Sequence, residues 1–134
     1  MIDNNTIFEA IKTALTDHPH IQLAIVYGSV VNNRMSVDSD IDIGVSAGRI
    51  LSIDERISLI SDLSHSIKRE IDLVDLGTIH GLLLYEILTK GKQIICKSSC
   101  LKADFMKEVV YFVEDFLPQI REFLDRRIRR FAFG

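Results

Sequence analysis

The sequence predicts one α+β domain with a small mixed β-sheet flanked by helices and followed by a C-terminal helix. Four short apolar runs of strand length alternate with segments of helical periodicity. The 134 residues are enough for one ordinary hydrophobic core. No linker rich in Pro, Gly or Ser and no internal repeat divides the chain. We therefore expect a core over residues 1–98 and a helical extension over residues 99–134 that packs on the core or on a partner.

The first half of the chain contains one predicted helix and two predicted strands. Asn4 and Asn5 can cap a helix that ends before Pro19. The run IQLAIVYG reads as a buried strand, and IDIGVS, from Ile41, as a second. A short helical turn is expected after Ser29.

The second half continues the alternation. Ser52 and Glu55 form a capping box for a helix, and EIDLVDL and KQIICK are the third and fourth strands. Gly91 is expected to end the helix between these strands, and the last helix, from Leu101, is expected to be interrupted at Pro118. The predicted inner face of the first of these helices is Ile53, Ile57, Ile60, Leu63 and Ile67. The second helix carries Leu82, Leu83, Ile87 and Leu88.

Composition limits the class of protein. The chain is 47% hydrophobic and 26% charged, as folded globular proteins are, and its net charge of −3 gives no reason to expect a nucleic-acid partner. No run approaches the roughly 18 apolar residues of a membrane span. The N-terminal MIDNNTIFEAIK has acidic and amide residues where a signal peptide is basic, so we expect a cytoplasmic protein without a membrane partner. Cys96 and Cys100 are expected to be reduced thiols.

The C-terminal segment is unusual in its composition. Six of the seven phenylalanines lie beyond residue 100, beside five arginines. One interpretation is an amphipathic helix with a solvated basic face, and the other is a docking surface for a partner protein. The sequence leaves both open.

Asp40 and Asp42 precede and enter the second predicted strand. Residues two apart on a strand point to the same face, and their Cα atoms are roughly 6.6 Å apart. Two such carboxylates repel each other unless a cation lies between them. Oxygen ligands favour a hard ion such as Mg²⁺, so the pair predicts a metal site. A calcium-binding loop starting at Asp38 is excluded, because Ile43 takes the required glycine position and Arg49 the closing glutamate position.

Asp72, in the third predicted strand, is the expected third carboxylate. Asp75 is three residues further on and would point to the opposite face of a regular strand. We therefore assign Asp72 to the site and interpret Asp75 as a strand-end or capping residue, although sequence alone does not exclude the reverse.

Gly28 and Ser29 follow the first predicted strand. Glycine lets the backbone approach a ligand closely, and a strand-to-helix junction presents unpaired N–H groups to an anion. Ser29 adds a hydroxyl donor. Phosphates held here, with a metal on the facing carboxylates, would form a nucleoside triphosphate site.

The pattern G-S-x10-D-x-D after an apolar strand, with a later aspartate, resembles the signature of the DNA polymerase β-like nucleotidyltransferase superfamily. Nearly the whole chain is similar to the minimal nucleotidyltransferases, the MNT or MntA-type antitoxins of HEPN/MNT toxin–antitoxin pairs. The resemblance implies a polymerase β-type fold and catalysis with two Mg²⁺ ions held by Asp40, Asp42 and Asp72. It also implies ATP as donor, bound at Gly28 and Ser29, and AMP transfer to a tyrosine of a HEPN ribonuclease toxin.

The chain departs from the common family loop GSRARG. Asn32 replaces an arginine and Asn33 stands where glycine is usual, although asparagine tolerates positive φ. Arg34 is a candidate phosphate contact.

Two alternative functions stay open at this stage. One is a non-catalytic antitoxin that neutralises the toxin by binding, and the other is a small-molecule transferase of the antibiotic-modifying type. The three clustered aspartates favour catalysis over binding alone. The sequence does not give the number of nucleotides transferred, the base preference or the stoichiometry of a complex.

Overall fold

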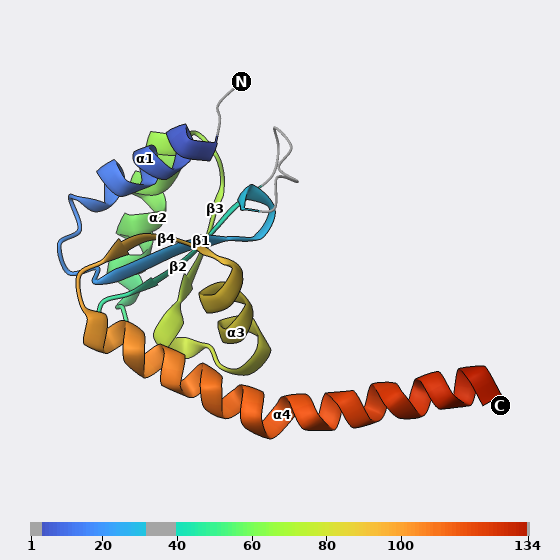
Figure 1. Ribbon diagram of the computed structural model, residues 1–134. Helices are drawn as coiled ribbons and strands as arrows, with labels where there is room; N and C mark the ends of the chain where they lie inside the picture. The colour runs from blue at the N-terminus through green and yellow to red at the C-terminus, as the bar shows by residue number, and fades with distance from the viewer. Residues whose placement is uncertain (1–3, 32–39, 134) are drawn as a thin grey trace.

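A four-stranded mixed β-sheet forms the centre of the protein in the computed structural model, which describes residues 4–31 and 40–133 (Figure 1). The strands are β1 (Leu23–Tyr27), β2 (Ile41–Ser46), β3 (Ile71–Asp75) and β4 (Lys92–Cys96), in the order β3-β2-β1-β4. β1 is antiparallel to β2 and β4, whereas β2 and β3 are parallel. All four predicted strands and the mixed sheet are therefore confirmed.

Helices cover both faces of the sheet (Figure 1). α1 (Asn4–Leu15) and α2 (Ile53–Ile67) pack with Ala24 and Val26 of β1 in one hydrophobic cluster. α3 (Gly81–Lys90) and the beginning of α4 (Ser99–Phe133) pack with Leu23 and Ile25 in a second cluster on the other face. The alternation of side chains along β1 thus divides the core into two layers.

Helix α2 begins as predicted and buries Leu63 and Ile67 of the predicted face, but not its first two residues. The capping box is present: Ser52 Oγ accepts from the N–H of Glu55, and Glu55 Oε1 accepts from the N–H of Ser52. The predicted inner face was wrong for Ile53 and Ile57, which are 75% and 61% exposed. The buried residues at four-residue spacing are Leu59, Leu63 and Ile67. Both isoleucines fit the helical period, so periodicity alone could not show that they are exposed while Leu59 is buried.

Gly44 leaves room on the sheet for Leu76, the residue that follows β3, and α3 packs beside it. A Cβ atom on Gly44 of β2 would come within 2.8 Å of Leu76 Cδ2 and 3.6 Å of Ile87 Cγ2. Leu84 and Ile87 are the buried residues of α3, whereas Leu82 and Leu83 are exposed. Gly91 ends the helix as predicted, with its N–H donating to the carbonyl of Ile87 at 2.9 Å.

Helix α4 runs for 35 residues and leaves the body of the protein (Figure 1). Val109 is buried against α3, and Val113 packs on the same cluster. The predicted interruption at Pro118 is wrong, because the helix continues through this residue. Figure 1 shows a change of direction in the middle of α4, which we attribute to the proline, since proline removes one helical hydrogen bond and crowds the preceding turn. No helix in the described part of the chain is both long and apolar enough to cross a membrane.

Candidate active site

Tyr27, Asp42 and Asp72 form a row across three adjacent strands. Tyr27 pairs with Asp42 in the antiparallel β1–β2 ladder, and Asp42 pairs with Asp72 in the parallel β2–β3 ladder. Residues opposite each other in register point to the same face. This face also carries Leu23 and Ile25, so the row continues the sheet surface that α3 and α4 cover further along.

The two aspartates interact directly. Partial burial raises the pKa of Asp42, and the charge of Asp72, a hydrogen bond between the two side chains and the charge of Asp40 raise it further. Burial, followed by the charges of Asp42 and Asp72, also raises the pKa of Tyr27 to about 12. The row is therefore a region of negative potential at which a bound cation would relieve repulsion.

The Gly28–Ser29 turn lies against this row. Gly28 has φ +78° and starts a short 3₁₀ helix, η1 (Gly28–Val30). A Cβ atom at Gly28 would overlap Oδ2 of Asp42. Two parts of the sequence pattern that are 14 residues apart therefore meet in space, and the contact requires a glycine for both its backbone angle and its lack of a side chain.

Asp40 lies at the edge of the described segment and is exposed. Its charge acts on Asp42, as the raised pKa of Asp42 shows. Among residues 4–31 and 40–133, no three His, Cys, Asp or Glu side chains are already arranged around a common metal position. The donor set nevertheless fits Mg²⁺: Asp42 and Asp72 are opposite each other on neighbouring strands, Asp40 precedes β2 by one residue, and all the donors are oxygens.

The family is decided by the match of residues 9–99 to the family described as Polymerase beta, Nucleotidyltransferase. The chain belongs to this family. The matched segment runs from α1 to the start of α4 and includes the Gly28–Ser29 turn and all three aspartates. The observed mixed sheet with flanking helices and a C-terminal helix is the polymerase β-like fold that the sequence predicted.

Two curated relatives are protein adenylyltransferases by name. The chain is 33% identical over 84 residues to "Protein adenylyltransferase MntA" of Shewanella oneidensis. This alignment covers 63% of the present chain but only 60% of the MntA chain. The chain is also 29% identical over 75 residues to "Putative protein adenylyltransferase MJ0435" of Methanocaldococcus jannaschii, covering 56% of this chain and 81% of that one.

Solved structures with the same fold are toxin–antitoxin complexes. A crystal structure of a toxin–antitoxin with AMP-PNP contains a chain that matches with a TM-score of 0.71 and 25% identity, covering 90% of this chain and 98% of that one. A structure of tri-AMPylated Shewanella oneidensis HEPN toxin in complex with MNT antitoxin matches with a TM-score of 0.67 and 24% identity, covering 93% and 98% of the two chains. The second likeness shows the fold alone.

Within this nucleotidyltransferase, Asp75 is a structural residue, as its spacing predicted. It is only 1% exposed, and its carboxylate accepts from the N–H of Leu51 at 2.8 Å and from the N–H of Gly77 at 2.9 Å. The second bond caps the 3₁₀ helix η2 (Leu76–Thr78). Asp75 points into the protein, whereas Asp72 is exposed beside Asp42.

Sequence reasoning missed Tyr27 as a member of the site. It was interpreted only as the end of an apolar strand, and its place beside Asp42 depends on the strand register, which the sequence does not give. Asn32, Asn33 and Arg34, where the chain departs from the family loop, lie outside the described residues. The expected phosphate contact of Arg34 therefore stays a prediction.

Proposed function

We propose that this protein is a cytoplasmic, Mg²⁺-dependent protein adenylyltransferase that acts as an antitoxin. It transfers AMP from ATP to a tyrosine of a HEPN-family ribonuclease toxin. The observation that carries the proposal is the position of Asp42, which pairs in register with Asp72 and occupies the space where Gly28 lacks a side chain. The similarity to MntA and to antitoxin chains in toxin–antitoxin complexes supports the acceptor class.

Each site residue has a defined task in this proposal. Asp40, Asp42 and Asp72 hold two Mg²⁺ ions, which when bound neutralise the triphosphate and favour loss of the acceptor's proton. The backbone N–H groups at Gly28 and Ser29, with the Ser29 hydroxyl, donate to phosphate oxygens. Asp72 is exposed, so an incoming hydroxyl group can reach it, and it completes the metal site or receives the acceptor's proton.

The reaction exchanges one phosphorus–oxygen bond for another. The tyrosine oxygen forms a bond to the α-phosphorus of ATP, the bond to the β-phosphate bridging oxygen breaks, and pyrophosphate leaves. Negative charge grows on the leaving group as this bond breaks. The triphosphate is itself negatively charged, so cations must screen the site carboxylates before it enters.

The decisive experiment combines the purified protein with α-labelled ATP, Mg²⁺ and the protein encoded by the neighbouring gene. We expect label on a tyrosine of that partner, identified by mass spectrometry, together with loss of its ribonuclease activity. Asp42→Asn and Asp72→Asn should abolish labelling, as should chelation of Mg²⁺. Asp17→Asn, an exposed acid on the α1–β1 connection, is the matched control and should label normally.

The same experiment separates the alternatives. Neutralisation that persists in Asp42→Asn without label transfer would identify a binding antitoxin. Label that moves to an aminoglycoside but not to the protein partner would identify a small-molecule transferase.

A further inference from the structure

No other element in the described part of the chain covers α4 beyond Pro118. It extends about 24 Å past the proline, taking 1.5 Å per residue, and projects away from the sheet and the other helices (Figure 1). Every side chain that the structure describes between Arg121 and Arg130 is exposed, including Phe123 at 58% and Ile128 at 63%. An isolated helix of this length is marginal in water, so we expect a second surface to stabilise it.

The exposed apolar residues continue the face by which α4 packs on the core. Val109 and Val113 pack on the α3 cluster, and helical spacing carries the same side of α4 on to Ile120 and Phe123. The guanidinium group of Arg127 lies 5.6 Å from the ring centre of Phe123. The distal half of α4 thus offers an apolar stripe with cationic groups along it.

The charges of α4 are divided between its two halves. Residues 99–118 contain two lysines and four carboxylates, whereas residues 119–130 contain five arginines and two carboxylates. The proximal half therefore carries a net charge of −2 and the distal half +3. Two such helices placed antiparallel set each basic half against the acidic half of the other.

The proximal half also offers a shallow groove that could receive the stripe. Two acidic side chains one turn apart lie among apolar ones, with one lysine beside them; its lining residues are Leu101, Asp104, Phe105, Lys107, Glu108 and Tyr111. Near the bend, Phe116 is partly exposed although it stacks on Phe112 at 4.9 Å between ring centres. The groove thus matches the distal half in both polarity and charge.

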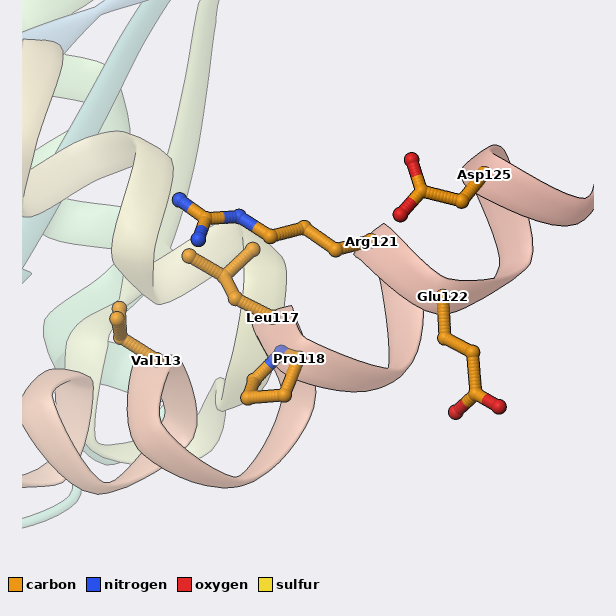
Figure 2. A pocket seen from close by; sticks show the side chains of 6 residues that line it. All are labelled: Val113, Leu117, Pro118, Arg121, Glu122 and Asp125. Atoms are coloured by element: carbon orange, nitrogen blue, oxygen red, sulfur yellow. The ribbon is translucent and has the colours of Figure 1, made fainter. Parts of the chain in front are cut away.

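A second hollow lies at the bend itself and belongs to α4 alone (Figure 2). Val113, Leu117 and Pro118 line its apolar part, and Arg121 runs back over Leu117. Glu122 points to the opposite side of the helix from Arg121 (Figure 2), and it is paired with Arg126 at 2.6 Å. Apolar side chains therefore reach from the packed half of α4 to the bend, and charged side chains line the hollow beyond it.

We propose that two copies of this chain associate through α4, antiparallel and two-fold symmetric. The distal stripe around Phe123 and Arg127 of each copy lies on the proximal groove around Asp104 and Glu108 of the other, with the Phe116 side chains near the symmetry axis. A two-fold arrangement makes the contact twice and closes the assembly, because each copy supplies both halves. This inference does not depend on the proposed catalytic function.

Sedimentation velocity and light scattering on the purified full-length protein test the proposal over a wide concentration series. We expect a species of twice 15.2 kDa that dissociates on dilution and weakens at high salt, because the contact is partly ionic. Arg127→Glu with Arg130→Glu should weaken association about tenfold or more, since attraction becomes repulsion. Lys12→Glu with Lys92→Glu makes the same change in net charge on exposed residues elsewhere and should leave association unchanged.

A charge exchange gives the sharper result. Adding Asp104→Arg and Glu108→Arg to the distal double variant should restore association, which loss of folding could not produce. Circular dichroism checks the helix content of every variant, and Phe123→Asp tests the apolar stripe without altering the arginines. A wild-type protein that stays monomeric at all concentrations would overturn the proposal, as would a monomer that assembles through α4 only with the neighbouring gene's product. Equal association of the wild type and both distal variants would also overturn it.

Discussion

Replacing Asp42 by asparagine should stabilise the metal-free protein at neutral pH. Asparagine has nearly the same shape as aspartate and keeps a hydrogen-bonding partner for Asp72, but it removes one charge from the carboxylate row. Burial and the neighbouring carboxylates raise the pKa of Asp42 above that of an ordinary aspartate. The folded state therefore holds this proton more tightly than the unfolded state does.

The sign of the pH dependence follows from this shift. The contribution of Asp42 to stability is fully present below its unfolded pKa and is lost as pH rises through the higher folded pKa. Neighbouring strands are about 4.8 Å apart, so two unit charges in register repel by about 1 kcal/mol in water and about 3 kcal/mol at an effective dielectric constant of 20. Because Asp72 is exposed, we expect the lower part of this range, about 1–2 kcal/mol. For a chain of this length that corresponds to a rise in Tm of roughly 3–8 °C.

Differential scanning calorimetry with a chelator present, at several pH values, measures this effect. The gain of Asp42→Asn over wild type should be largest near neutral pH and should shrink as the pH approaches the unfolded pKa of aspartate. Mg²⁺ should raise the Tm of the wild type more than that of the variant. Asp17→Asn, which removes a charge far from the site, is the control. A lower Tm for Asp42→Asn than for wild type in chelator, or a difference that does not change with pH, would refute the reasoning.

Four further substitutions test the site and the framework around it. Gly28→Ala should destabilise the fold by about 1–3 kcal/mol and abolish nucleotide binding measured by calorimetry, because the new methyl group meets Asp42 at a positive φ. A normal nucleotide affinity would show that the turn is not part of the site. Asp75→Ala leaves the buried N–H of Leu51 and the partly buried N–H of Gly77 without an acceptor and should cost about 1–3 kcal/mol in denaturant unfolding, with the Mg²⁺ response of the folded protein retained. Loss of that response would place Asp75 in the metal site. Leu63→Ala should cost about 2–5 kcal/mol, whereas Ile57→Ala should change stability by less than about 0.5 kcal/mol, and equal effects would contradict the observed face of α2.

Local signals in the sequence were sufficient for the strands and for the ends of two helices. Each strand is a short apolar run between turn or capping residues, so its position depends mainly on nearby residues. The capping box at Ser52 and the glycine at position 91 are also local, because a few neighbouring groups determine where a helix begins or ends. For the same reason Asp75 could be recognised as a capping residue from its spacing.

The buried faces of the helices were less predictable. Ile53 and Ile57 are as apolar and as regularly spaced as Leu59 and Leu63, and only the direction from which α2 meets the sheet decides between them. Likewise, Pro118 predicted a break because proline removes a hydrogen bond, yet the helix continues through it with a change of direction.

By itself, the sequence determined which residues have the chemistry of the site: two carboxylates two residues apart on a strand, a third on a later strand, and a Gly-Ser turn before them. Only the tertiary structure decided how they meet. The parallel register of β2 and β3 sets Asp72 beside Asp42, the antiparallel register of β1 adds Tyr27, and the left-handed turn at Gly28 brings the backbone against the Asp42 carboxylate. The physical reason is that strand pairing joins residues far apart in the chain, and a shift of one residue would turn every side chain of a strand to the other face.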